Sequence, residues 1–162
     1  MGIVNAASSL DRIDRKILAA LQADARLTNQ ALSDRVALSP SACLARVRRL
    51  EREGFIQGYH ARLDPFSIEV GLVLFAEVVL RSQGAEDLAE FDEIISAIPQ
   101  IVEASHVSGN YDYLLKVVVA DLDEWARITE RLTANGGGAD RITTLVLLHK
   151  PKIFVGYPVP QR

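Results

Sequence analysis

The feature that most constrains the fold is the start of a helix at Ser39-Pro40. The serine side chain can cap a helix, and proline in the first helical position loses only an N–H group that would be unpaired there. The helical pattern then continues to Glu53 and stops at Gly54. This segment is therefore predicted to be a short helix with a sharply defined beginning and end.

Two further helical patterns precede it. Apolar residues recur at helical spacing from residue 11 to about residue 23, and Asp11 can cap that helix. Thr28 can cap a short second helix, which ends in a turn at Ala37-Leu38. Three short helices with a tight turn between the last two predict a helix-turn-helix unit.

The third helix has two chemically different sides on a helical wheel. Cys43, Val47 and Leu50 form an apolar stripe that can anchor it to its neighbours. Small residues on the other side allow close approach to base edges, and the arginines can reach phosphates or guanine, so we expect this side to bind double-stranded DNA. The predicted DNA-binding residues are Ser39, Ser41, Ala42, Ala45, Arg46, Arg48, Arg49 and Arg52.

A basic helix can also be a solvated surface helix with charge pairs four residues apart, such as Arg49 with Glu53. Its position as the third helix, after a short capped one, favours the DNA-binding interpretation. The charge distribution agrees. The chain has a net charge of -3, but residues 1–64 carry ten Lys or Arg and seven Asp or Glu, whereas residues 65–162 carry eight and fourteen. Only the basic front half is expected to meet phosphate.

Beyond Gly54 the pattern becomes mixed. Strands are expected at 55–63, 72–81, 101–107, 113–119 and 142–148, and helices at 85–98 and 122–132. From residue 72 the order is β-α-β-β-α-β, which predicts an α+β, ferredoxin-like domain with four antiparallel strands and both helices on one face. The strand at 72–81 does not alternate apolar and polar residues, so its outer face needs a cover. A second copy of the sheet is the simplest cover, and we expect a homodimer.

Other features narrow the class of protein. No apolar run approaches the roughly 20 residues of a membrane-spanning helix, so no membrane partner is expected. The single cysteine, Cys43, points inward on the wheel and is interpreted as a core residue in a reducing cytoplasm. His60, His106 and His149 lack metal-ligand spacing. We expect no metal, no cofactor and no enzymatic activity.

Residues 10–65 and the segment SHVSGNYDYLLKVVV at 105–119 carry a family resemblance. The first resembles the N-terminal half of the Lrp/AsnC, or feast/famine, regulators, and the second resembles the central hairpin of that family's effector-binding RAM domain. The resemblance implies transcription regulation by dimers that assemble into tetramers or octamers on bacterial or archaeal DNA, with an amino acid or related metabolite as effector.

The resemblance also implies an effector site beside the hairpin loop. Carried over by position, its residues are Ser108, Gly109, Asn110, Tyr111, Asp112 and Thr143. Gly109-Asn110 is also a good tight-turn dipeptide, and the two roles are compatible. Three positions depart from the family: Ala37 stands where glycine is usual in the turn, Asn110 replaces the commoner aspartate, and the glycine-rich run 135–138 replaces a Pro-Gly pair, for which a flexible loop is expected.

The sequence thus predicts five segments: a tail (1–9), a helix-turn-helix domain (10–54), a linker strand and turn (55–70), a ferredoxin-like RAM domain for effector binding and oligomerisation (71–150), and a C-terminal tail (151–162). Two other functions remain open at this stage. One is an architectural protein that wraps DNA with little sequence preference. The other is an enzyme or a stand-alone metabolite-binding module, since ferredoxin-like domains host both.

Overall fold

The computed structural model describes residues 10–68, 71–134 and 136–160. The chain forms two compact units, one made of Met1–Ala61 with Lys152–Arg162 and the other of Arg62–Pro151. We call them the helical unit and the sheet unit. The tail expected at residues 1–9 lies outside the described residues, as does Asn135 of the glycine-rich run.

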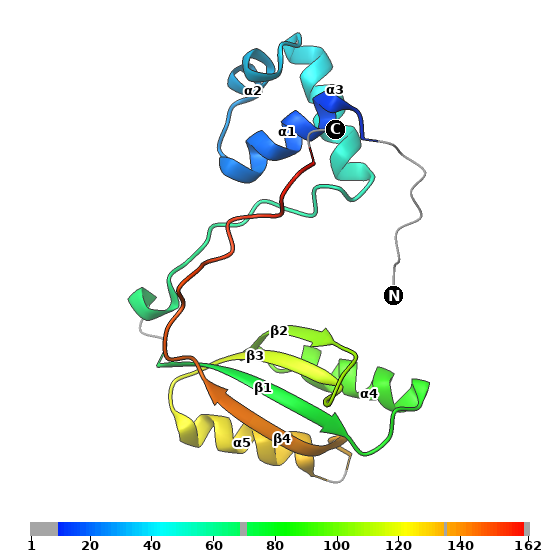
Figure 1. Cartoon of the computed structure of the whole chain (residues 1–162), viewed down its shortest axis with the longest axis vertical. Helices are drawn as coiled ribbons and strands as arrows, with labels where there is room; N and C mark the ends of the chain where they lie inside the picture. The colour runs from blue at the N-terminus through cyan, green and yellow to red at the C-terminus, as the bar shows by residue number, and fades with distance from the viewer. Residues whose placement is uncertain (1–9, 69–70, 135, 161–162) are drawn as a thin grey trace. The chain divides into compact units, whose positions relative to one another are not determined.

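The helical unit contains α1 (Arg12–Ala23), α2 (Asn29–Val36) and α3 (Pro40–Arg52), shown in Figure 1. Each begins at a side-chain cap, as the sequence predicts. Thr28 accepts a hydrogen bond from the backbone N–H of Ala31 at 3.1 Å, and Ser39 accepts one from Ala42 at 3.3 Å. These caps satisfy N–H groups that have no partner inside the helix, so they fix where α2 and α3 begin.

The turn between α2 and α3 passes through Ala37, whose backbone is left-handed with φ 57° and ψ 50°. Its Cβ makes this conformation cost about 1 kcal/mol relative to glycine. The packing of the three helices offsets this cost. Apolar side chains from all three helices form one core: Ile17, Ala20, Leu32, Val36, Cys43 and Leu50.

The sheet unit has a short 3-10 helix, Pro65–Ile68, followed by β1, α4, β2, β3, α5 and β4. The four strands form one antiparallel sheet in the order β2-β3-β1-β4, and α4 and α5 cover one face (Figure 1). This is the predicted ferredoxin-like fold. The bounds are β1 Leu72–Leu80, α4 Ala85–Ser96, β2 Ile101–His106, β3 Tyr113–Val119, α5 Leu122–Thr133 and β4 Ala139–Val146.

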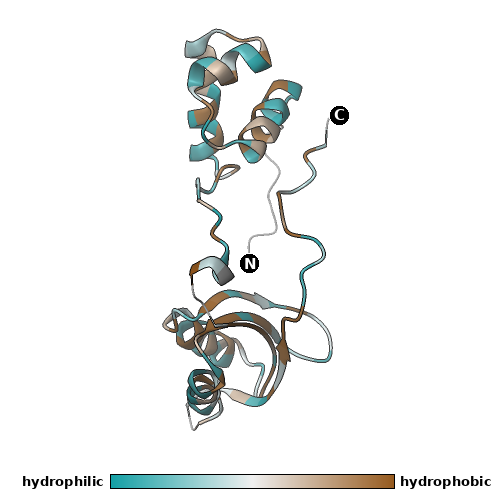
Figure 2. Cartoon of the chain, turned by 90° about the vertical axis from the view of Figure 1, so that its left-hand side faces the viewer, coloured by the Kyte–Doolittle hydropathy of each residue, from teal (hydrophilic) through white to brown (hydrophobic). Residues whose placement is uncertain are grey.

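The covered face of the sheet carries the core of this unit. Leu74, Ala76 and Val78 of β1 are fully buried, together with Leu115 and Val117 of β3. Helix α5 is also held by a polar contact, because the Trp125 indole N–H donates to the Thr144 hydroxyl at 2.9 Å. The two central strands, β1 and β3, are apolar along most of their length (Figure 2).

The other face of the sheet is apolar without a cover from the helices. Strand register pairs Phe75 with Leu145, so both side chains lie on this outer face, where Leu145 is 44% exposed and Phe75 half-buried. This face also carries two charged residues, Glu77 of β1 and Lys116 of β3, and Lys116 pairs with Phe75 in the register. The lack of alternation seen in the sequence is therefore real, and it leaves apolar area open to solvent.

The strand expected at residues 55–63 is not present: that segment has no regular secondary structure in this chain. An extended segment counts as a strand only when a neighbour pairs with its backbone, and within the described residues no strand lies beside it. In the glycine-rich run, a Cβ at Gly137 would collide with the Leu132 carbonyl oxygen, so the backbone there passes close to the end of α5. Across the described ranges, none of the helices is long and apolar enough to cross a membrane.

Candidate nucleic-acid interface and effector loop

Helix α3 is anchored by one side and open on the other. Cys43 and Leu50 are fully buried against α1 and α2, as the wheel predicts, while Ser41, Ala42 and Ala45 are exposed. Ser39 also shares a hydrogen bond with Ser41 between their hydroxyls at 3.2 Å. The open side near the beginning of α3 therefore presents small side chains, which let the helix backbone come close to base edges in a major groove.

Further along the same helix, Arg48 and Arg52 are exposed. Neither forms an ion pair with any carboxylate in the described part of the chain. Their guanidinium groups are consequently available for phosphate oxygens or for the O6 and N7 atoms of guanine. We therefore regard these two as the arginines of α3 that can meet DNA most directly.

Arg46 and Arg49, which are also among the predicted DNA-binding residues, contact α1 through ion pairs. Arg46 donates from one terminal nitrogen to Asp14 at 2.8 Å and to Asp11 at 2.6 Å, and Arg49 donates to the other oxygen of Asp14 at 2.5 Å. A terminal nitrogen of Arg49 also lies 3.8 Å from a carboxylate oxygen of Glu53. This is the charge pair that the interpretation of α3 as a solvated surface helix predicts. These two arginines join α3 to α1, and each remains about one-third exposed.

Asp14 is the centre of this network. Its side chain is only 1% exposed, and it also accepts the backbone N–H of Asp11 at 3.1 Å. A buried carboxylate is tolerated only when charge partners and hydrogen bonds replace its lost hydration. Asp14 was assigned no role from the sequence, so this network was missed. The available signal was two acids three residues apart in one helix, matched by two arginines three residues apart in another.

The pKa of Asp11 is lowered from 3.8 to about 2, first by the hydrogen bond from the backbone of Asp14 and next by the Arg46 guanidinium. A group with a lowered pKa stabilises the fold above its unfolded value and loses that contribution as pH falls toward the folded value. We therefore expect stability to decline between about pH 4 and about pH 2. In Asp11→Asn, which keeps a capping oxygen, that decline should be shallower in acid titrations followed by circular dichroism, and an unchanged curve would contradict the assignment.

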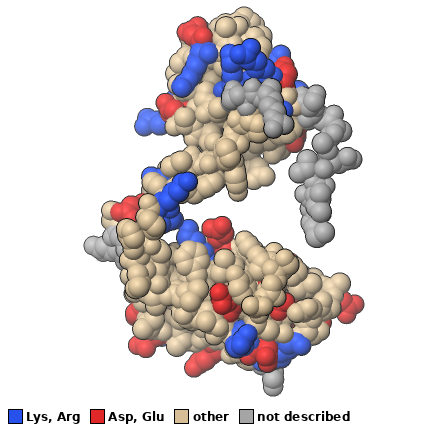
Figure 3. Space-filling model, in the orientation of Figure 1, with Lys and Arg blue, Asp and Glu red and all other residues tan. Residues whose placement is uncertain are grey.

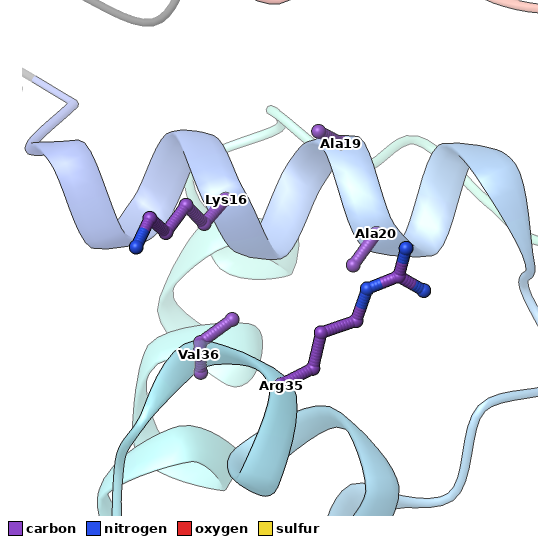
Figure 4. Close-up of a pocket in the computed structure, with 5 residues that line it drawn as sticks. All are labelled: Lys16, Ala19, Ala20, Arg35 and Val36. Carbon is purple, nitrogen blue, oxygen red and sulfur yellow. The ribbon is translucent and has the colours of Figure 1, made fainter.

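Two hollows lie in the helical unit. One, of about 400 Å³, is lined by Ala45 and by the four charged residues of the α1–α3 network. The other, of about 280 Å³, lies between α1 and α2 and is lined by Lys16, Ala19 and Ala20 of α1 and by Arg35 and Val36 of α2 (Figure 4). Both are shallow and open.

The predicted effector loop connects β2 to β3. A hydrogen bond from the Val107 N–H to the Asp112 carbonyl at 2.9 Å closes the loop, and one from the Asp112 N–H to the Val78 carbonyl at 2.8 Å joins its end to β1. Ser108, Gly109 and Asn110 are exposed at its tip, and a Cβ at Gly109 would have open space around it. The tip therefore leaves its backbone groups accessible to a small molecule.

Asp112 is buried and serves the loop itself. One carboxylate oxygen accepts the backbone N–H of Leu80 at 2.7 Å, and the other accepts the Gln83 side-chain amide at 2.8 Å. Each oxygen thus already has a partner in the chain, which ties the loop to the end of β1. An effector amino group would have to share these oxygens rather than find them vacant.

Replacing Asp112 by alanine would leave the Leu80 N–H buried without a partner, which costs about 1–3 kcal/mol. We expect the sheet unit to lose that much free energy of unfolding, measured by denaturant titration. Asp112→Asn, which keeps one acceptor oxygen, is the matched control and should retain more of it. Equal losses in the two variants would show that the bond to Leu80 does not hold the loop.

Thr143 is exposed on β4 and pairs in register with Glu77, so it lies on the outer face of the sheet. Glu77 in turn pairs with Leu114 of β3, so β1 lies between Thr143 and β3, the strand that follows the loop.

The aromatic residues of the loop region are more buried. Tyr111 is half-buried. Below the loop, the Tyr113 hydroxyl donates to Asp92 at 2.8 Å, and its ring stacks on His106 with centroids 4.9 Å apart. The pKa of Tyr113 is raised, chiefly by burial.

Lysine and arginine side chains gather on the helical unit in the view of Figure 3. Among the described residues, no group of three or more histidine, cysteine or acidic side chains is arranged to hold a metal ion. The lone cysteine, Cys43, is buried, and its pKa is raised by burial.

Comparisons with known proteins agree with this arrangement. Residues 10–57 match the family described as winged helix-turn-helix DNA-binding, and residues 73–155 match the Lrp/AsnC ligand binding domain. The leucine-responsive regulatory protein of Escherichia coli strain K12 is 44% identical over 144 residues, covering 88% of this chain and 87% of that protein. The leucine-responsive regulatory protein of Klebsiella pneumoniae has the same identity and coverage.

Solved structures show the same fold. A transcriptional regulator from Neisseria meningitidis, in complex with L-methionine, has a TM-score of 0.83 and 33% identity, covering 93% of this chain and 97% of that one. An AsnC family transcriptional regulator from Agrobacterium tumefaciens has a TM-score of 0.81 and 32% identity, covering 91% and 96%.

A helix-turn-helix unit followed by a ferredoxin-like effector unit defines a class of DNA-binding regulators that respond to small molecules. The chain belongs to the Lrp/AsnC family of transcriptional regulators. It is thus a regulator and not an enzyme, and its partners are DNA and a small-molecule effector.

Proposed function

We propose that the chain regulates genes of amino-acid or related metabolism by binding specific operators through α3, with an amino acid as its effector. The observation that supports the proposal is that the residues of α3 make contacts on two different sides of the helix. Arg46 and Arg49 hold the helix to α1, whereas Arg48, Arg52 and the small residues at its start face outward. A helix fixed on one side and basic on the other fits a major groove.

The identity of the effector class comes from the relatives. One relative is named for its response to leucine, and a solved neighbour holds L-methionine. We place the effector at the tip residues Ser108, Gly109 and Asn110, with Tyr111, Asp112 and Thr143 beside them. The exposed tip supports this placement, because its backbone N–H and carbonyl groups can bind an amino acid's own carboxylate and amino groups.

We further propose that the chain acts as a homodimer that assembles into a tetramer or octamer. The outer face of the sheet supports this: Phe75, Val79 and Leu145 leave apolar surface there that a second sheet would bury. Two α3 helices related by a two-fold axis would read inverted half-sites about 34 Å apart, or a multiple of that spacing. Sedimentation should give a dimer or larger species, and a monomer at micromolar concentration would contradict this part.

A regulator of this kind works where the chromosome lies, so we place it in the cytoplasm of a bacterial or archaeal cell, associated with the nucleoid. The decisive experiment is selection of genomic DNA fragments by the purified chain, with and without a panel of amino acids. We expect enriched fragments that share an inverted repeat and whose affinity changes with at least one amino acid. Equal affinity for selected and random duplexes would instead favour DNA wrapping without sequence preference.

A further inference from the structure

The C-terminal segment 156–160 belongs to the helical unit and is held there by α1 (Figure 1). The Gln22 side-chain amide donates to the Tyr157 carbonyl at 2.6 Å, and its oxygen accepts the Tyr157 N–H at 2.9 Å. One glutamine therefore satisfies both backbone groups of a residue 135 positions away. Arg15 adds a hydrogen bond to the Pro160 carbonyl at 3.2 Å.

The segment has a sequence suited to this contact. Gly156 has a φ of +129°, which residues with a Cβ rarely adopt, and a Cβ there would displace the Gln22 side chain, so glycine favours the close approach while Gln22 is present. Pro158 and Pro160 fix their own φ and favour an extended form at the residues before them, which lowers the entropy lost when the segment docks. The segment is thus built to lie along α1.

The same contact is easily released. Tyr157 is 75% exposed, Pro158 and Pro160 are exposed as well, and of the apolar side chains in the segment Val159 is half-buried, so docking buries little apolar area. Hydrogen bonds at an exposed surface exchange readily with water, and such contacts open at low free-energy cost. The ring of Phe154 packs edge-on against Tyr157, with centroids 4.9 Å apart, which stiffens the segment itself rather than its contact with α1.

The position of the segment in the chain links the contact on α1 to the sheet unit. It follows β4, the strand that carries Thr143, and returns to the helical unit, so the two units are joined by the chain at both 61–62 and 151–152. We propose that segment 156–160 is a releasable strap whose docking on α1 couples the state of the effector unit to DNA binding. This inference rests on the proposed function above.

The physical argument is one of restricted freedom. A docked strap closes a loop between the units and limits the orientations that the helical unit can sample. In a dimer, this raises the effective concentration of the second α3 at the second half-site once the first is bound. An effector that favours one state of the strap changes DNA affinity by its differential affinity for the two states.

Docking is tested by a designed disulfide. A Cβ at position 156 would touch Cγ of Gln22, which is one bond from the Cβ of that residue. The Cβ atoms of Gln22→Cys and Gly156→Cys therefore come within about 4 Å, the separation that a disulfide requires. In a Cys43→Ala background, oxidation should produce a cross-link within one chain, seen as a faster monomer band on a non-reducing gel. A cross-link between chains, or none, would overturn the strap.

Coupling is tested by Gln22→Ala, with Gln57→Ala as the control that removes the same side chain from an exposed position. DNA duplexes selected by the unmodified chain are titrated with and without L-leucine and L-methionine. Gln22→Ala should weaken binding to paired half-sites about tenfold, leave binding to a single half-site unchanged, and lose the response to the amino acids. Calorimetric binding of the amino acids themselves should persist.

Gln22→Ala that matches the control in both affinity and response would overturn the coupling while leaving the proposed function intact. If the unmodified chain responds to neither amino acid, the proposed choice of effector fails together with the regulatory role of the strap. Docking would still be decided by the cross-link, which needs neither DNA nor effector.

Discussion

Arg46→Met with Arg49→Met should lower the free energy of unfolding of the helical unit by about 3–5 kcal/mol. Both arginines donate to Asp14, whose side chain is 1% exposed. Removing them leaves a carboxylate that is buried, charged and short of two charge-assisted hydrogen bonds. Denaturant titration followed by helical circular dichroism measures the loss.

The matched control is Arg48→Met with Arg52→Met, which makes the same chemical change on the same helix at residues without a carboxylate partner in the described ranges. Its stability should change by less than about 0.5 kcal/mol. Adding Asp14→Leu to the first variant should restore much of the loss, because an apolar group then replaces the stranded charge. Equal losses in the two arginine pairs would refute the network.

The same control variant gives the second large effect, on DNA binding. Arg48→Met with Arg52→Met should weaken operator binding by about 30-fold or more, since each arginine bound to a base or phosphate contributes about 1–3 kcal/mol. The slope of log affinity against log salt should become shallower by about one for each phosphate that an arginine no longer neutralises. Fluorescence anisotropy over a series of salt concentrations measures both quantities.

Arg127→Met with Arg131→Met removes two exposed arginines from α5 and serves as the charge-matched control. It should leave affinity and salt slope unchanged. If both arginine pairs weaken binding equally, the chain attracts DNA by overall charge, and α3 has no special part in recognition.

Much of the fold was predictable from local signals. The caps at Asp11, Thr28 and Ser39 define where the three helices begin, because capping depends on residues close in sequence. The β-α-β-β-α-β order and the apolar outer face of β1 also follow from periodicity. The prediction of a strand at 55–63 was wrong. A segment becomes a strand only when another strand pairs with it, and the sequence of the segment alone does not show whether such a partner is present.

The candidate site was predictable only in part, for the same physical reason. A wheel drawn for α3 alone places Arg49 on the outward side, but packing against α1 brings it to Asp14. Likewise, the loop sequence offers Asp112 as a ligand for an effector, whereas in the fold its oxygens meet Leu80 and Gln83. The docking of Tyr157 on Gln22 spans 135 residues and left no local signal.

The central claim is that the open side of α3 lies in the major groove of bound DNA. Site-directed cleavage tests it directly: Ala42→Cys in a Cys43→Ala background, carrying an iron chelate on the new thiol, is bound to a selected duplex. We predict strand cleavage confined to two patches related by two-fold symmetry, and none from the same chelate on Arg127→Cys of α5. Diffuse cleavage from both positions, or a bound complex that α3 fails to cut, would contradict the account.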